Sequence, residues 1–361
     1  MSLNTEQVQA FLQTLQDPEA GVALLEAGRV RQLTVEGNAV TLDLELGYPV
    51  QSRLPEMRDW LAEQLRQIGA DPVKVELRWA VTAHAVQSGL RLMPGVRNII
   101  AVASGKGGVG KSTTAANLAL ALAAEGARVG VLDADIYGPS QPTMLGISGQ
   151  PRSNDGATMV PLEAHGLQVN SIGFLVDPET PMVWRGPMVT QALEQLLRKT
   201  QWNDLDYLVV DMPPGTGDIQ LTLSQKVPVT GAVIVTTPQD IALIDARRGL
   251  KMFEKVGIPI LGVVENMSMH VCSQCGHTEP IFGEGGGQRM AQDYDIPWLG
   301  GLPLALAIRE HADSGRPSVV AEPDGAEARA YRAIARRLAG RVAMRARDMT
   351  SRFPSIVVQN T

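Results

Sequence analysis

The first part of the chain alternates apolar and polar residues in a way that predicts a small sheet. Residues 30–46 alternate on both sides of Gly37 and Asn38, and alternation around such a turn-forming pair predicts a β-hairpin. Residues 73–81 alternate in the same way. Because side chains of a strand point to opposite faces in turn, both stretches are expected to be half-buried strands of one unit.

Two stretches of the same region have the apolar spacing of amphipathic helices. One covers residues 6–17 and the other residues 54–69. The second begins at Pro55, which suits the first turn of a helix, and closes at Gly69, which suits its end. Helices and strands together predict that residues 1–83 form a small α/β domain.

The rest of the chain has short, continuously apolar runs in place of alternation. They occupy residues 98–104, 128–135, 207–213, 232–238 and 259–266. Helical stretches lie between several of them, as at residues 112–126 and 240–257. Apolar strands that alternate with helices predict an α/β fold with a mostly parallel sheet covered by helices on both faces.

Residues 84–97 contain turn residues and little periodicity, so we expect a linker there. It separates the small domain at residues 1–83 from a large domain at residues 98–361. A chain of 361 residues also fits two domains better than one core.

An arginine-rich stretch at residues 327–347 carries one apolar stripe. The stripe consists of Tyr331, Ile334, Leu338 and Val342. We expect a surface helix packed on the large domain. A helix lying on a membrane surface is the alternative, although the stripe lacks large anchoring residues.

Composition excludes several classes of protein. The net charge of −6 gives no reason to expect a nucleic-acid partner held by bulk electrostatics. The sequence has no run of about eighteen uncharged apolar residues, so no membrane span is predicted. The polar N-terminus lacks the pattern of a signal peptide, and two cysteines make no secreted disulfide framework, so a cytoplasmic location is expected.

The stretch GKGGVGKS, residues 105–112, has a glycine-rich phosphate-binding pattern between an expected strand and an expected helix. Glycines let backbone N–H groups close around phosphate oxygens, and the helix N-terminus adds partial positive charge. Lys111 is expected to neutralise the β and γ phosphates of ATP, and Ser112 to ligate Mg²⁺. The nucleotide-binding residues predicted here are Gly105, Lys106, Gly107, Gly108, Val109, Gly110, Lys111, Ser112 and Thr113.

Lys106 is an additional lysine that a general phosphate loop does not need. It is either a solvated surface charge or a second cation for the transferring phosphoryl group. The loop directs its side chain away from its own phosphate, so a partner chain's nucleotide is the expected target.

Acidic residues end two of the expected strands. Asp133 and Asp135 follow one, and Asp211 ends another as a Walker-B-like carboxylate that holds Mg²⁺ through water. Ligands of open α/β sheets bind at the carboxyl ends of strands, so these residues are expected beside the phosphate loop.

Cys272 and Cys275, the only cysteines, are separated by two residues in a loop rich in turn formers. A redox pair is one reading, but such a pair should begin a helix. Half of a four-cysteine zinc site and half of an iron–sulfur site are two others. His270 and His277 could complete a zinc site within one chain, and buried unreactive cysteines remain a further possibility.

Lys106 and the cysteine pair both point to a homodimer. Lys106 is expected to contact a second nucleotide, and the cysteine pair needs two more thiolates to complete a four-cysteine site. A two-fold axis supplies both, because each surface meets the partner's copy or site across the axis.

A string of motifs carries a family resemblance. SGKGGVGKST, GVLDADIYGPS, WRGPM, VVDMPPGTGD, ENMS and C-x-x-C occur in that order. They resemble the Mrp/ApbC family of iron–sulfur cluster carrier ATPases, which belong to the MinD/ParA-like group of deviant Walker A proteins. The resemblance covers about residues 92–320, and residues 1–83 resemble the MIP18-type domain often fused in front.

The resemblance implies roles for individual residues. Lys106 would act across the dimer and Lys111 within its own loop, while Asp135 would position the attacking water in catalysis. Ser112, Asp133 and Asp211 would lie at the magnesium. Asn266 would contact the adenine, and Cys272 and Cys275 would hold a [4Fe–4S] cluster bridging two chains.

The small domain departs from its family pattern in one respect. MIP18-type domains often carry a cysteine after their second strand, and residues 47–56 here contain none. Partner binding is therefore expected of this domain in place of a metal role.

The expected function is a slow ATPase that carries a cluster to apo-proteins after receiving it from a scaffold. The alternatives are a MinD/ParA-like organiser that acts on membrane or DNA, and an ATPase with structural zinc at the cysteine pair.

Overall fold

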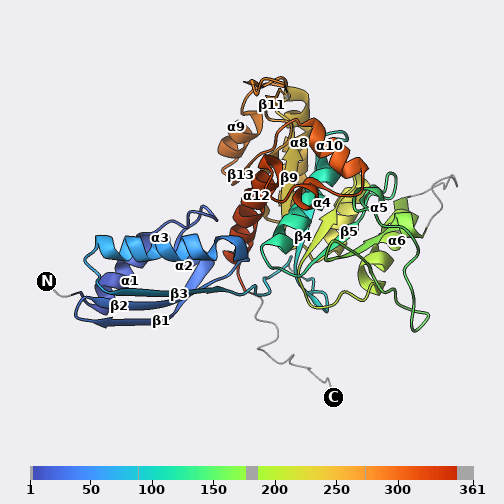
Figure 1. Ribbon diagram of the computed structural model, residues 1–361. Helices are drawn as coiled ribbons and strands as arrows, with labels where there is room; N and C mark the ends of the chain where they lie inside the picture. Colours follow the sequence, from blue (N-terminus) through green and yellow to red (C-terminus); the bar gives the residue numbers. More distant parts are fainter. Residues whose placement is uncertain (1–2, 88, 176–185, 273, 348–361) are drawn as a thin grey trace, which may run out of the picture.

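The computed structural model describes residues 3–87, 89–175, 186–272 and 274–347. Figure 1 shows a small N-terminal unit beside a larger one built around a second sheet, with the long C-terminal helix between them. Trp184 and Arg185 of the WRGPM motif lie outside the described residues.

The N-terminal unit is a three-stranded sheet packed against helices. Its elements are α1 (Thr5–Thr14), α2 (Leu24–Ala27), β1 (Gly28–Glu36), β2 (Ala39–Leu46), the 3₁₀ turn η1 (Gln51–Arg53), α3 (Leu54–Gln67) and β3 (Val73–Trp79). β1 and β2 pair antiparallel across Gly37, which has a φ of +65° that suits glycine. The predicted hairpin is thus confirmed, while β3 pairs with β2 in parallel.

The second of the two helices predicted in this unit forms for the expected reasons. α3 has proline in its first turn, and Gly69 follows it with a φ of +92°. Met57, Leu61 and Leu65 are buried, four residues apart, so one face of α3 covers the sheet.

The large sheet has eight strands in the order β13-β10-β9-β4-β8-β5-β7-β6. The strands are β4 (Val96–Ala103), β5 (Val129–Asp133), β6 (Leu162–Ala164), β7 (Leu167–Ser171), β8 (Leu205–Asp211), β9 (Gly231–Thr236), β10 (Ile260–Glu265) and β13 (Trp298–Gly301). Every neighbouring pair is parallel except β6 and β7. The predicted mostly parallel sheet is confirmed.

Helices cover both faces of this sheet. They are α4 (Lys111–Ala124), α5 (Gln141–Met144), α6 (Gly186–Lys199), α7 (Asp218–Lys226), α8 (Asp240–Lys255), α9 (Gly286–Asp293), α10 (Leu306–Asp313), α11 (Ser318–Ala321) and α12 (Ala326–Ala343), with a 3₁₀ turn η2 (Ile172–Phe174) after β7. Along β4, Ile100 and Val102 join the apolar core that contains α4 and α12. Ile99 and Ala101 join the core on the other face with α6, α7 and α8.

The C-terminal helix is part of the core. Tyr331, Ile334, Leu338 and Val342 of α12 are buried, and the helix packs along α4 (Figure 1). The prediction of a packed helix is confirmed, and the alternative of a membrane-facing stripe is wrong because the stripe is covered. No helix among the described residues is long and apolar enough to cross a membrane.

A cluster of charged and polar groups around the buried Glu125 joins the N-terminal unit to the large one. Glu125, the residue after α4, is buried and accepts hydrogen bonds from the Ser52 N–H at 3.0 Å and from its hydroxyl at 2.7 Å. Arg336 of α12 donates to Glu125 at 2.7 Å and to Glu19 at 2.7 Å. We call these four residues the joint cluster.

β4 begins at Val96, inside the stretch expected as a linker. Apolar residues of both units also belong to one continuous core. The division into residues 1–83, 84–97 and 98–361 stays a prediction.

Candidate nucleotide site and cysteine hairpin

The phosphate loop connects β4 to α4 in a tightly fitted conformation. Gly108 and Gly110 have φ angles of +81° and +79°, which L side chains rarely adopt. A Cβ on Gly105 would lie 2.0 Å from the carbonyl carbon of Asp245, so α8 leaves no room for a side chain there. Glycine is required at these positions by backbone angle or by space.

A cavity of about 280 Å³ opens over this loop. It is lined by Lys106, Gly107, Gly108, Gly110, Lys111, Ser112, Thr113 and Asp135, with Ser104, Gly138, Ser140, Met144 and Pro214. Of the predicted loop residues, Gly105 and Val109 do not line it, and the Val109 side chain is buried in the core. The others face the space that a phosphate chain would need.

Lys111 is buried and paired with acid. Its ammonium group forms an ion pair with Asp211, whose side chain is also buried, and lies 3.1 Å from the Ser112 hydroxyl. The structure thus brings together the predicted phosphate lysine and two predicted magnesium ligands, from α4 and β8. The Lys111 ammonium group thus lies between the Ser112 hydroxyl and the Asp211 carboxylate.

Asp133 is a buried carboxyl group with an unusual proton affinity. Burial, followed by the neighbouring negative charge of Asp211, raises the pKa of Asp133 to about 7. Its oxygens accept hydrogen bonds from the backbone N–H groups of Asp135 and Gln141, each at 3.1 Å, and from the Ser171 hydroxyl at 3.1 Å. These donors fix the carboxyl group beside the phosphate loop.

Asp135 borders the phosphate cavity and a second cavity of about 410 Å³ that Tyr137, Pro213 and Ile219 also line. Burial raises the pKa of Asp135, which the positive charge of Lys111 opposes. A carboxyl group whose pKa is raised is a stronger base, which suits it to accept a proton from water beside the phosphates.

Ser112, Asp133 and Asp211 together fit a magnesium ion. Mg²⁺ takes oxygen ligands, and this set offers a hydroxyl and two carboxylates. The Lys111 ammonium held between Ser112 and Asp211 shows that a positive charge is stabilised there.

Gln141 is a residue of this site that no sequence motif indicated. It is buried and donates from its side chain to Asp211 at 2.9 Å. A glutamine one residue after a glycine-proline-serine loop gives no signal of its own, because its position depends on how that loop folds back.

Asn266 supports the phosphate loop from the end of β10. Its side-chain amide donates to the Val109 carbonyl at 2.9 Å, and a Cβ on Gly110 would lie 2.1 Å from the same nitrogen. The predicted contact between Asn266 and adenine stays a prediction.

Lys106 contributes its backbone carbonyl to the loop by accepting from the Ser104 hydroxyl at 2.8 Å. Its ammonium group has no hydrogen bond or ion pair with the residues that the structure describes. The side chain is therefore available for a group outside the chain.

The cysteine pair lies in a small hairpin, where sequence had predicted a loop. β11 (His270–Val271) pairs antiparallel with β12 (Thr278–Glu279), and neither cysteine is in a disulfide. Within the turn, the Cys272 N–H donates to the His277 carbonyl and the Gly276 N–H to the Cys272 carbonyl, both at 2.9 Å. Cys275 is exposed and Cys272 partly so.

The turn favours a thiolate at Cys272. Backbone N–H groups of Cys275, and then of Gln274, hydrogen-bond its sulfur and lower the pKa of Cys272. A thiolate is the form that binds metal.

The described residues contain no group of three or more His, Cys, Asp and Glu side chains placed to hold a metal ion. His270, one of the two histidines considered for zinc, directs its Nδ1 to the Leu304 carbonyl at 3.2 Å.

Exposed apolar side chains follow the carboxyl ends of several strands. Tyr137 follows β5, Ile241 follows β9, Val271 and Ile281 follow β10, and Leu306 follows β13. Carboxyl ends of parallel strands lie at one edge of a sheet, so these residues share the edge that carries the phosphate loop and the cysteine hairpin. We call them the apolar rim.

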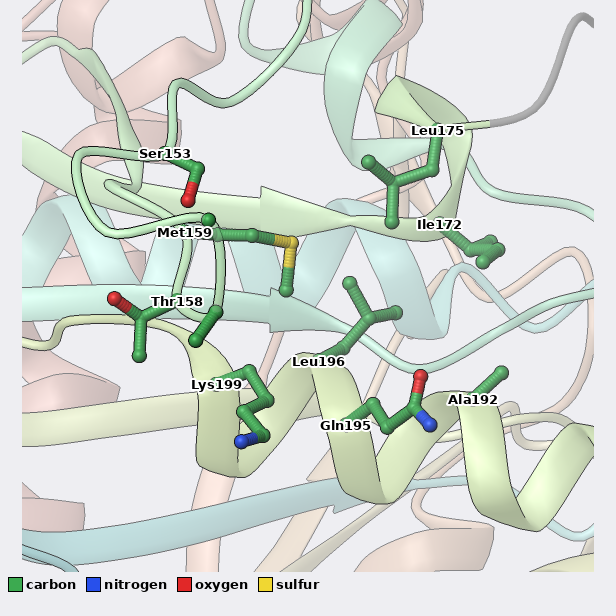
Figure 2. Close-up of a pocket in the computed structure, with 11 residues that line it drawn as sticks. Ser153, Thr158, Met159, Ile172, Leu175, Ala192, Gln195, Leu196 and Lys199 are labelled. Atoms are coloured by element: carbon green, nitrogen blue, oxygen red, sulfur yellow. The ribbon is translucent and has the colours of Figure 1, made fainter.

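A further hollow of about 450 Å³ lies between α6 and the loop at residues 153–159 (Figure 2). Figure 2 shows Met159, Ile172, Leu175 and Leu196 around it, with Lys199 below. None of the residues predicted for nucleotide or metal binding lines this hollow.

The doubly covered parallel sheet and its glycine-rich loop define a P-loop nucleotide-binding protein. A family model described as an NUBPL iron-transfer P-loop NTPase matches residues 95–339, and one described as an iron-sulfur cluster assembly protein matches residues 5–77. The first match covers more than half of the chain, which therefore belongs to the NUBPL iron-transfer P-loop NTPase family.

Similar proteins align with two thirds or more of the chain. The iron-sulfur cluster carrier protein of Pseudomonas fragi is 61% identical over 269 residues, which are 74% of this chain and 94% of that protein. The protein of that name from Escherichia coli K12 is 56% identical over 84% of this chain and 83% of its own. The iron-sulfur cluster transfer protein NUBPL of Mus musculus is 56% identical over 67% of this chain and 76% of its own.

Solved structures agree with this assignment. A nucleotide-binding protein of Archaeoglobus fulgidus, in complex with ADP, has a TM-score of 0.56 and 36% identity, covering 64% of this chain and 90% of its own. The cell division ATPase MinD of Pyrococcus furiosus has a TM-score of 0.51 and 23% identity, covering 67% and 98%, which shows the shared fold. The resemblance to the Mrp/ApbC carriers is confirmed, for both units of the chain.

Proposed function

We propose that this chain is an ATP-dependent carrier of iron–sulfur clusters. Two copies hold a [4Fe–4S] cluster between their cysteine pairs as cargo, receive it from a scaffold and pass it to apo-proteins. The family assignment and the names of the relatives support carriage of a cluster. Two cysteines in each chain supply half of the four thiolates that such a cluster needs.

The residues around the phosphate loop account for the nucleotide step. Backbone N–H groups of the loop and the start of α4 bind the phosphates, and Lys111 exchanges Asp211 for phosphate oxygens. Ser112, Asp133 and Asp211 hold Mg²⁺, which when bound neutralises charge on the phosphates. Asp135 orients the attacking water and accepts its proton.

Two chains meet at the carboxyl edge of the sheet. The apolar rim is the surface that such a contact would bury. The Lys106 ammonium, which has no partner among the described residues, reaches the partner's nucleotide from the same edge. A cation supplied across an interface stabilises charge that develops during phosphoryl transfer.

One observation supports coupling between nucleotide and cargo most directly. Asn266 holds the backbone of the phosphate loop through Val109, and the chain reaches Cys272 six residues later. A change in the loop on ATP binding or hydrolysis is therefore transmitted over a short, hydrogen-bonded path to the cysteine hairpin. A carrier of this kind needs only slow ATP turnover.

The test is anaerobic reconstitution with iron and sulfide, followed by size separation and metal analysis. We expect a brown species of two chains with about four irons per pair of chains. Cys275→Ala should bleach it, while the matched hairpin variant Thr278→Ala should leave it intact. Both variants should bind ATP as the parent does.

A colourless monomer that contains zinc would contradict the carrier function. His277→Ala decides between the two sites, because a zinc site within one chain would lose metal with this change and a bridging cluster would not. Cluster transfer to an apo-protein by Cys272→Ala at the parental rate would also contradict it.

A further inference from the structure

Gln141 occupies an unusual position beside the proposed magnesium site. It is the first residue of α5, which follows Asp133 at the end of β5 and the loop that carries Asp135, and it is 0% exposed. A glutamine is rarely buried without a definite set of partners, because its amide would otherwise lose its hydrogen bonds to water. Its partners therefore indicate what it does.

These partners include all three residues that we assign to Mg²⁺. The Gln141 side-chain nitrogen donates to Asp211 Oδ2 at 2.9 Å and to the Ser112 carbonyl at 3.0 Å. Its backbone N–H donates to Asp133 Oδ2 at 3.1 Å. One residue thus connects the end of β5, the end of β8 and the first turn of α4.

The contacts divide the two oxygens of Asp211 between two donors. Oδ1 pairs with Lys111 and Oδ2 accepts from Gln141. When Lys111 turns to a phosphate, Gln141 remains to hold the plane of the carboxylate. The orientation of the amide is itself determined, because both of its acceptors are oxygens that only the NH₂ group can satisfy.

A neutral amide suits this place better than a charged group. Asp133 and Asp211 are buried close together, and a glutamate here would add a third carboxylate that cannot donate when ionised. A lysine would neutralise the carboxylates and compete with the metal ion. The Gln141 carbonyl oxygen is buried without a hydrogen-bond partner among the described residues. That oxygen is free to accept from a group bound at the site.

We infer that Gln141 is a positioning residue for the magnesium ion of the nucleotide complex, given the nucleotide site proposed above. Its side chain acts through Asp211 by fixing the direction in which Oδ2 points, and it holds the first turn of α4, which carries Ser112, through the Ser112 carbonyl. Residues that orient metal ligands in this way commonly change metal affinity by about 10- to 100-fold when removed.

The chain offers a matched control in Gln87. Its side-chain nitrogen also donates to two oxygens, in this case the backbone carbonyls of Ser224 at 2.9 Å and Val227 at 3.0 Å. Its carbonyl oxygen is likewise buried without a partner among the described residues. It touches the C-terminal end of α7 and none of the magnesium residues, so Gln87→Leu removes the same donors at another place.

The experiment measures affinity for a fluorescent ADP analogue in the full chain, with Mg²⁺ and with EDTA. In the parent protein, Mg²⁺ should tighten binding. Gln141→Leu should need about 10- to 100-fold more Mg²⁺ for the same tightening, while its affinity in EDTA stays within about twofold of the parent. Gln87→Leu should follow the parent in both conditions.

Each other outcome contradicts a specific statement. An unchanged magnesium requirement in Gln141→Leu overturns the role of Gln141. Equal losses with Mg²⁺ and with EDTA also overturn it, because they indicate a general structural role. Gln141→Met, which is apolar and more flexible, replaces Gln141→Leu if that variant does not fold. A parent protein whose binding ignores Mg²⁺ would instead contradict the nucleotide site.

Discussion

At the scale of single residues, the raised pKa of Asp133 has a consequence for stability. The carboxyl group titrates near 3.8 in an unfolded chain and near 7 in the folded protein. Between these values the folded protein binds a proton that the unfolded chain does not. The free energy of unfolding therefore falls as pH rises through this range, and the contribution is fully present only below the lower value.

Asp133→Asn should remove this pH dependence in protein free of nucleotide and magnesium. We expect the stability of the parent relative to the variant to fall by at least about 1 kcal/mol between about pH 5 and about pH 8. Urea unfolding at the two pH values measures it. Comparison of parent and variant cancels the other titrating groups, among them Asp135, whose pKa is also raised.

Asp155→Asn is the control. A hydrogen bond from Thr158, followed by backbone N–H groups, lowers the pKa of Asp155, so it is ionised in both states over this pH range. The difference in free energy of unfolding between Asp155→Asn and the parent should not change with pH. A constant difference for Asp133→Asn as well would show that Asp133 has an ordinary proton affinity.

The positions of site residues could be predicted where they follow from the order of the chain. The strand, glycine-rich loop and helix located Lys111 and Ser112, and the rule that ligands lie at carboxyl ends of strands located Asp133, Asp135 and Asp211. Gln141 could not be found this way. Its contacts with Ser112 and Asp211 arise because a loop folds back over the sheet, and no local pattern encodes that path.

At the scale of elements, strong patterns predicted strands and helices, and weak ones did not. The five continuously apolar runs became β4, β5, β8, β9 and β10. β13 is four residues long and contains two glycines, so its strand character comes only from pairing with β10. The parallel pairing of β3 with β2 also could not be predicted from the sequence, because alternation indicates which side chains are buried and not the direction of a strand.

For α12, the sequence pattern alone did not decide between a helix packed on the large domain and a helix on a membrane surface. A pair of substitutions tests the packing. Leu338 is 0% exposed, so Leu338→Ala should lower the free energy of unfolding by about 2–5 kcal/mol through lost burial and a cavity. Met344, the residue after the same helix, is 36% exposed, and Met344→Ala should cost less than about 1 kcal/mol. Urea unfolding gives both values. Equal small losses would mean that α12 does not pack on α4 in solution.

At the scale of the whole molecule, the joint cluster ties the N-terminal unit to the far end of the phosphate-loop helix. α4 begins at Lys111 beside the phosphate cavity and ends at Ala124, directly before Glu125 of the cluster. Arg336 is the member that reaches both Glu125 and Glu19. Loss of that side chain leaves the buried Glu125 carboxylate without its cation.

Arg336→Met should therefore loosen the two units from each other. We expect a loss of about 3–5 kcal/mol, and two unfolding transitions in urea where the parent shows one. Arg329→Met is the control on the same helix, because Arg329 is exposed and bonds only the nearby Asp324 carbonyl among described residues. A single transition at the parental midpoint in Arg336→Met would show that the cluster adds little to the union of the units.

The order of strands in the large sheet also sets an order of events during synthesis. β4 lies between β8 and β9, which leave the ribosome more than a hundred residues after it, and α12, which covers α4, comes last of the described elements. The N-terminal sheet has all its strands within residues 28–79 and can form early. Until α12 arrives, the face of the apolar α4 that packs against α12 stays uncovered. A nascent chain with this apolar face exposed is prone to aggregation, and slow translation between β5 and β8 would prolong that risk.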